Sequence, residues 1–129
     1  MKTVHTAARN MPPPSVQAEH WRTDAGTDSV AVLTIPGLLA RARVFDVDVT
    51  LTVDVPADAT GATHGLTVEL DGQRQWTRSI HSNNPGQTDG LDYHQRVRLE
   101  AEQTLRIRAV ATIKGVRIRQ LLVEAREEL

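Results

Sequence analysis

The sequence VFDVDVTLTVDV, residues 44–55, decides the fold of this chain. Apolar and polar residues alternate along it. Successive side chains of a β-strand point to opposite faces, so the alternation predicts a strand with one buried and one solvated face. Asp46, Asp48 and Asp54 fall on the solvated face. The buried face is expected to carry Phe45, Val47, Val49, Leu51, Val53 and Val55.

Segments of similar patterning precede and follow this stretch, separated by turns rich in Gly, Pro, Asn and Asp. Residues 29–35 are apolar on both faces, which is typical of a central, covered strand. Asp71-Gly72 lies between two alternating runs and predicts a two-residue hairpin turn. Residues 38–42 are expected to form a single helical turn. The further strands are expected at residues 17–23, 64–70, 73–81, 92–99, 104–111 and 116–125.

About eight strands with almost no helix predict an all-β fold, an antiparallel two-sheet β-sandwich of jelly-roll type. In the last strand Val116 and Ile118 share one parity, whereas Leu121 and Val123 share the other, which predicts a β-bulge. We expect one β-sandwich domain at residues 16–129. Residues 1–15 end in three prolines and are expected to form a flexible tail or linker.

Composition removes several classes of function. The chain has 129 residues, no cysteine and a formal net charge of -1. These values exclude a disulfide framework and a cysteine-based zinc site, and they argue against nucleic acid as a partner. No apolar stretch is long enough to cross a membrane, and the N-terminus shows no secretory signal. The compartment stays open: the chain is cytoplasmic, or it is part of a larger or processed protein.

The C-terminal half resembles jelly-roll carbohydrate-binding modules with galactose-binding-like folds. The similarity rests on the runs WTRSI, YHQRVRLE, TLRIRAVA and VRIRQLLVEA. Such modules often close with a strand of the form V-x-I-x-x-L-x-V-E, represented here by Val116, Ile118, Leu121, Val123 and Glu124. The resemblance implies a jelly roll more than it implies a ligand.

A candidate ligand site surrounds the long polar loop expected at residues 82–91. Sugars stack their apolar faces on aromatic rings and bind planar polar groups through their hydroxyls. Trp76 could supply the ring and Arg78 a polar partner, although a tryptophan in a strand is also an ordinary core residue. The predicted contact set is Trp76, Arg78, His81, Asn83, Asn84 and Tyr93. The predicted function is a non-catalytic binding module, most plausibly for carbohydrate.

Three arginine pairs, each at a spacing of two, form a second pattern. They are Arg96 and Arg98, Arg106 and Arg108, and Arg117 and Arg119. On neighbouring strands of one sheet they would line a single face and could bind an anion. The alternative is that they pair across strands with the aspartates of residues 44–55.

Other chemistry has weaker signals. Asp89, Asp92 and His94 are weak metal candidates, with calcium as the ion, but their spacing matches no known ligand motif, so no cofactor is expected. Ser79 or Ser82 lacks a nucleophile elbow, so the sequence favours a non-catalytic protein over an enzyme. The alternative function is a structural or assembly domain that forms homo-oligomers or packs against another protein chain. Residues 29–35 are apolar on both faces and the parity changes near Leu121, which motivates this alternative.

Overall fold

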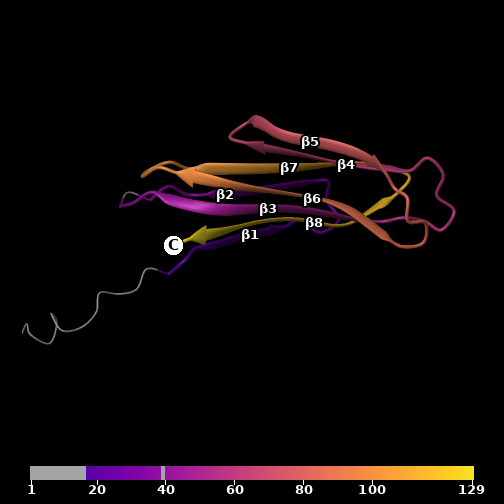
Figure 1. Cartoon of the computed structure of the whole chain (residues 1–129), viewed down its shortest axis with the longest axis horizontal. Coiled ribbons are helices and arrows are strands. Elements are labelled where there is room, and N and C mark those ends of the chain that lie inside the picture. The colour runs from indigo at the N-terminus through magenta and orange to yellow at the C-terminus, as the bar shows by residue number, and fades with distance from the viewer. Residues whose placement is uncertain (1–16, 39) are drawn as a thin grey trace, which may run out of the picture.

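A computed structural model describes residues 17–38 and 40–129 of the chain. They form two four-stranded sheets that lie face to face (Figure 1). Sheet A has the order β1-β8-β3-β6, and sheet B has the order β2-β7-β4-β5. Every strand pair is antiparallel. The strands are β1 (His20–Asp24), β2 (Val30–Ile35), β3 (Arg43–Asp54), β4 (Thr63–Leu70), β5 (Gln73–His81), β6 (Thr88–Leu99), β7 (Leu105–Lys114) and β8 (Arg117–Glu128).

The connections make this sandwich a jelly roll. Apart from β4 and β5, which are hydrogen-bonded neighbours in sheet B, consecutive strands of the described residues lie in opposite sheets. Two four-stranded sheets joined in this way confirm the predicted all-β sandwich. The tail predicted at residues 1–15 lies outside the described residues. The described part of the chain contains no helix long and apolar enough to cross a membrane.

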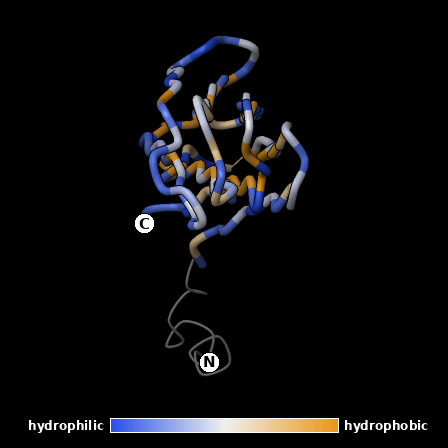
Figure 2. The backbone as a smooth tube through the Cα atoms, turned by 90° about the vertical axis from the view of Figure 1, so that its right-hand side faces the viewer, coloured by the Kyte–Doolittle hydropathy of each residue, from blue (hydrophilic) through white to orange (hydrophobic). Residues whose placement is uncertain are grey.

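β3 lies in the middle of sheet A, between β8 and β6. Its predicted inner face is confirmed, since Phe45, Val49, Leu51 and Val53 are 0% exposed. Removing a side chain of this size from water contributes roughly 1.5–3 kcal/mol. Orange apolar positions recur along the strands in Figure 2, and the buried ones form one core cluster. The facing layer from sheet B includes Ile35, Leu66, Val68, Leu105, Ile107 and Ala109, all buried.

Two local predictions about the backbone are confirmed. Asp71 and Gly72 join β4 to β5 with φ values of 50° and 80°, the left-handed geometry that a two-residue hairpin needs. The register between β3 and β8 shifts where Thr52 pairs with Gln120 but Val53 pairs with Ile118. Arg119 is therefore the extra residue of a bulge, which accounts for the change of parity along the last strand.

The prediction that residues 29–35 form a central strand is wrong. β2 is an edge strand, because it pairs with β7 alone within sheet B. Its inner residues Ala31, Leu33 and Ile35 are buried, whereas Val30 is 39% exposed on the outer face. Apolar residues on both faces usually indicate cover on both sides, and the single chain provides that cover on one side only.

Several boundaries and one short element also differ from the prediction. The loop expected at residues 82–91 ends at Gln87, because β6 begins at Thr88 and pairs with Asp54 of β3. The last strand, expected to end at residue 125, continues to Glu128. The described residues at 38–42 form no helical turn. This segment crosses close to a turn, where the amide of Glu102 donates to the carbonyl of Leu38 at 2.7 Å.

A partly buried ionic network fastens the start of β1 to the ends of β3 and β8. The guanidinium of Arg43 is 1% exposed and donates to Glu19 and to the carbonyl of Pro36, each at 2.6 Å. Glu127 pairs with Arg41 and also accepts from the amide of Glu19 at 3.0 Å. The hydrogen bond from Arg41 is the main reason that the pKa of Glu127 is lowered.

The pH dependence of stability tests this network. A lowered folded-state pKa stabilises the fold above the ordinary glutamate pKa of about 4.3, and the effect disappears as the pH falls through the folded value. We therefore expect Glu127→Gln to lower the free energy of unfolding by about 1–3 kcal/mol at neutral pH. The difference should shrink in urea titrations as the pH falls below the ordinary glutamate pKa. Glu100→Gln is the control, since its exposed pair with Arg98 contributes at most about 1 kcal/mol.

Gly90 supplies a second test, because β6 approaches β3 unusually closely at this residue. A Cβ atom at Gly90 would lie 2.4 Å from the carbonyl oxygen of Leu51. Gly90→Ala should therefore push the strands apart and lower the free energy of unfolding by about 1–3 kcal/mol. Hydrogen exchange of the β3 amides near Leu51 should accelerate. Ser79→Ala, which changes an exposed side chain on β5, should leave that exchange unchanged.

Candidate functional site

The aromatic residues of the predicted site meet at one open edge of the sandwich. Trp76 of β5 and Tyr93 of β6 stack with their ring centroids 5.0 Å apart and an interplanar angle of 23°. Trp76 pairs with the buried Val68, and Tyr93 pairs with the buried Val49, so both rings point between the sheets. Both are half-buried because β5 and β6 are edge strands. The ring pair thus closes the side of the sandwich while remaining partly accessible.

Planar polar groups adjoin this ring pair. The hydroxyl of Tyr93 donates to the side-chain oxygen of Gln95 at 2.8 Å. The amide of Gln95 in turn donates to the side-chain oxygen of Gln75 at 3.4 Å, so the two glutamines bridge β6 and β5. A register shift between Val68 and Glu69 leaves Gln75 as the extra residue of a bulge. Trp76, Tyr93, Gln75 and Gln95 are called the β5–β6 edge site below.

The other predicted ligand residues are placed differently. Arg78 is exposed and shares the face of β5 that carries Trp76. His81 has the opposite parity and is also exposed, so it lies on the outer face of sheet B. Asn83 and Asn84 follow in the loop, where the side chain of Asn84 donates to the carbonyl of Thr88 at 3.3 Å. The structure therefore brings Trp76 and Tyr93 together, while His81 faces away from them.

The weak metal candidates are split between the two faces of β6. Asp92 and His94 lie on the outer face of sheet A, whereas Asp89 has the opposite parity. No group of three or more His, Cys, Asp or Glu side chains within residues 17–38 and 40–129 is arranged to hold a metal ion.

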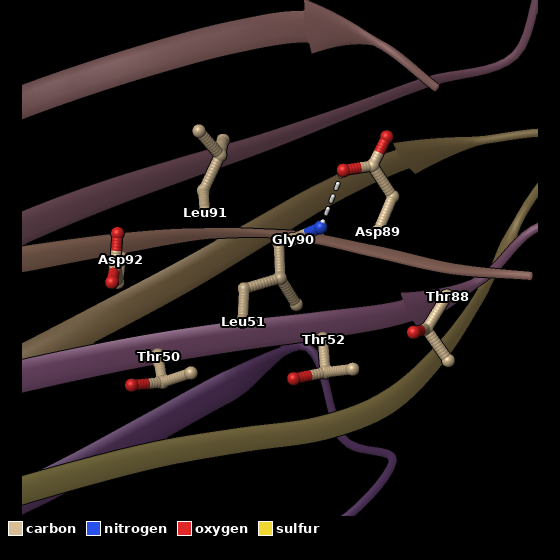
Figure 3. Close-up of a pocket in the computed structure, with 8 residues that line it drawn as sticks. All are labelled: Thr50, Leu51, Thr52, Thr88, Asp89, Gly90, Leu91 and Asp92. Carbon is tan, nitrogen blue, oxygen red and sulfur yellow. Dashed lines mark hydrogen bonds between the residues drawn. The ribbon is translucent and has the colours of Figure 1, made fainter. Parts of the chain in front are cut away.

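A polar hollow on the outer face of sheet A was not predicted from the sequence. Its cavity volume is about 320 Å³, and its residues come from β3 and β6 (Figure 3). Gly90 has no side chain to fill the space between Thr88 and Asp92, which explains the depression. The sequence signal for this hollow is Asp89-Gly90. Its composition indicates a turn, but both residues belong to β6. The lining is Thr50, Leu51, Thr52, Thr88, Asp89, Gly90, Leu91 and Asp92.

A second hollow of about 400 Å³ shares Thr50 and Asp92 with the first. Its charged groups are compensated, since Arg126 lies 3.6 Å from Asp48 and 3.0 Å from Glu124. The hydrogen bond from His20 and the charge of Arg126 are the main causes that lower the pKa of Glu124, so its carboxylate stays ionised. These groups neutralise one another rather than offering a single charge to a ligand.

The arginine pairs do not form one face. β6 and β8 are separated by β3 in sheet A, and β7 belongs to sheet B. Most of these arginines have carboxylate partners. The pairs are Arg96 with Glu128, Arg98 with Glu100, Arg108 with Glu69 and Arg119 with Asp54. Of these four arginines, only Arg119 pairs with an aspartate of residues 44–55, and only Arg108 and Arg119 pair with an adjacent strand. Cross-strand pairing therefore accounts for part of the pattern.

One buried polar cluster lies near the start of β6. His64 is 0% exposed, and its Nδ1 atom lies 2.7 Å from the hydroxyl of Ser82. Its Nε2 atom is 4.0 Å from Asp89 and makes no hydrogen bond among the described residues. Ser82 and His64 are both buried, so the cluster is placed to pack and to hydrogen-bond rather than to receive a substrate.

No family model matches the chain, and no curated protein matches it significantly. Among solved structures, dimeric latent PorU from Porphyromonas gingivalis is similar with a TM-score of 0.46 and 8% identity, over 93% of this chain. A T13 viral particle of IBDV is similar with a TM-score of 0.44 and 17% identity, over 86% of this chain. The chain spans only 14% and 31% of those two proteins.

The CBM36-1 domain of a multidomain xylanase, from the hindgut metagenome of Trinervitermes trinervoides, is also similar. Its TM-score is 0.37 at 11% identity, and the match covers 83% of this chain and 96% of that domain. The likeness in all three cases is one of architecture. It matches the resemblance to carbohydrate-binding modules at that level alone.

The buried His64 cluster yields a stability prediction. Ser82→Ala removes the hydrogen bond to the imidazole and leaves a buried polar group unpaired, which should lower the free energy of unfolding by about 1–3 kcal/mol. Ser79→Ala, at an exposed position on β5, should change it by no more than about 0.5 kcal/mol. Guanidinium unfolding curves measure both. Equal values for the two variants would show that the Ser82 contact contributes little.

Proposed function

We propose that this chain is a non-catalytic binding domain for carbohydrate and that the β5–β6 edge site binds the ligand. The observation that supports this proposal is the half-buried stack of Trp76 on Tyr93 at an open edge of the sandwich. A fully buried ring would serve packing alone, whereas a half-buried one keeps apolar surface available to a ligand.

The groups beside the rings suit a sugar. The C–H face of a pyranose can cover the accessible part of an aromatic ring, while its hydroxyls need planar donors and acceptors. Gln75 and Gln95 supply amides, and Arg78 supplies a guanidinium on the same strand as Trp76. These side chains offer hydrogen-bond donors and acceptors, so they suit the binding of hydroxyl groups.

The direction of β5 suggests how a longer ligand would lie. A chain of sugars running along this strand from Trp76 would pass Arg78 and continue toward the loop after His81. Asn83 and Asn84 in that loop could then bind further hydroxyls through their amides. In this arrangement the rings fix the ligand and the loop adds specificity, and His81 contributes only if it turns toward the same side.

Binding is tested by tryptophan fluorescence and by affinity electrophoresis against soluble glucans, xylans, mannans and galactans. Trp21→Phe leaves Trp76 as the single tryptophan, so any ligand-induced change reports on the edge site. We expect one polysaccharide class to shift this signal. Trp76→Ala should weaken binding by at least about tenfold, as loss of an aromatic anchor does.

Two variants separate loss of binding from loss of folding. Arg78→Ala changes an exposed side chain, so it should reduce affinity while leaving the unfolding midpoint nearly unchanged. Arg98→Ala is the matched control. Arg98 is exposed in β6, on the face opposite to the one that carries Tyr93. The proposal fails if no polysaccharide binds, or if Arg78→Ala and Arg98→Ala have equal effects.

A further inference from the structure

The free edge of β2 offers backbone groups to a partner. The amide of Ala111 donates to the carbonyl of Ser29 at 2.8 Å, which sets the phase of the pairing between β2 and β7. In an antiparallel pair these bonds alternate, so the N–H and C=O groups of Val30, Val32 and Thr34 point away from β7. The carbonyl of Val32 confirms this direction, since it accepts from the hydroxyl of Thr23 in β1 at 3.1 Å.

β2 is also the one uncharged edge strand in the part of the chain that the structure describes. Charged side chains commonly protect sheet edges against pairing with another molecule. β1 has the sequence HWRTD, β5 has QRQWTRSIH with a bulge, and β6 has TDGLDYHQRVRL. By contrast, β2 has the sequence VAVLTI, with no charge, proline or bulge. The strand itself therefore lacks these protections, and β1 approaches its edge through the hydroxyl of Thr23.

We propose that a second copy of this chain pairs with β2 in an antiparallel manner, about a twofold axis near Val32. In this register Val30 lies opposite the partner's Thr34, and Val32 lies opposite the partner's Val32. Each of these residue pairs would exchange two backbone hydrogen bonds, which joins the two B sheets into one. The carbonyl of Val32 can keep its bond to Thr23, because a carbonyl oxygen has two lone pairs.

Self-complementarity is the reason for choosing a second copy as the partner. A twofold axis brings identical residues together, so a charged edge would meet its own charge, whereas the β2 edge meets β-branched side chains that pair well across strands. Two arginines of β7 share this outer face, Arg108 opposite Val32 and Arg106 opposite Thr34, and Arg108 is already paired with Glu69. The partner also covers Val30, which is 39% exposed in the single chain.

The contact is small, and its strength follows from its size. A contact centred on one six-residue strand belongs with the transient interfaces that bury less than about 1,200 Å². We therefore expect a monomer–dimer equilibrium at high protein concentration rather than a permanent dimer. This interaction goes beyond the proposed carbohydrate binding and does not depend on it.

Sedimentation equilibrium of the full chain over a wide concentration range tests the dimer. The wild-type chain should show a reversible dimer, and Val30→Lys should raise the dissociation constant at least about tenfold by placing like charges at the edge. Thr77→Lys is the matched control, since it adds the same charge to the outer face of β5 at the opposite edge of sheet B. It should leave the dissociation constant unchanged.

A second variant tests the backbone pairing itself. Thr34→Pro removes an N–H that faces the free edge, so it should abolish the dimer without breaking the bonds between β2 and β7. Hydrogen exchange should show that the amides of Val30, Val32 and Thr34 become protected as the concentration rises. A chain that stays monomeric at the highest concentration would overturn the proposal, as would a dimer that both β2 variants leave intact. At concentrations where both proteins are monomers, polysaccharide binding by Val30→Lys should equal that of the wild type, which separates this result from the proposed function.

Discussion

The burial of one face of β3 constrains the rest of the sandwich. Because the side-chain period of a strand is two, a shift of one residue would place Asp46, Asp48 and Asp54 in the core. Both neighbouring strands must keep a register that matches this burial, since β3 pairs with β6 along one edge and with β8 along the other. β6 does so in continuous register from Arg43 to Asp54. β8 does so only because the bulge at Arg119 shifts its register between Thr52 and Val53.

The same constraint sets the electrostatics of the outer face. With its apolar residues inward, β3 presents a line of aspartates between two strands that carry basic residues. Asp46 lies 3.3 Å from His94, Asp48 lies 3.6 Å from Arg126, and Asp54 lies 3.2 Å from Arg119. These pairs are exposed and individually weak. Without the aspartates of β3, however, the basic side chains of β6 and β8 would have no opposite charge between them. Charge on sheet A is therefore explained largely by strand pairing.

The sequence predicted what local periodicity determines and missed what pairing determines. The inner face of β3, the Asp71-Gly72 turn and the bulge of β8 follow from alternation and turn chemistry, and all are confirmed. The alternation of residues does not indicate whether a strand lies at the centre or at the edge of a sheet. The sequence therefore predicts a central position for β2, which is an edge strand. Asp89-Gly90 favours a turn by composition, yet pairing with β3 keeps these residues extended and opens the hollow that was missed.

The candidate site shows the same division. The sequence identifies Trp76 and Tyr93 as separate candidates. Their stacking depends on the sheet order, because β5 and β6 are end strands of the two facing sheets and lie on the same side of the sandwich. The order of sheet B adds a consequence for the assembled protein. β2 and β5 form its two ends, so a dimer joined through β2 would leave the two β5–β6 edge sites free and far apart. Such a dimer presents two sites to one polymer, and linked sites raise the apparent affinity without any new contact in either. A weak self-association and a modest sugar affinity would then reinforce each other on a repetitive ligand, although neither requires the other.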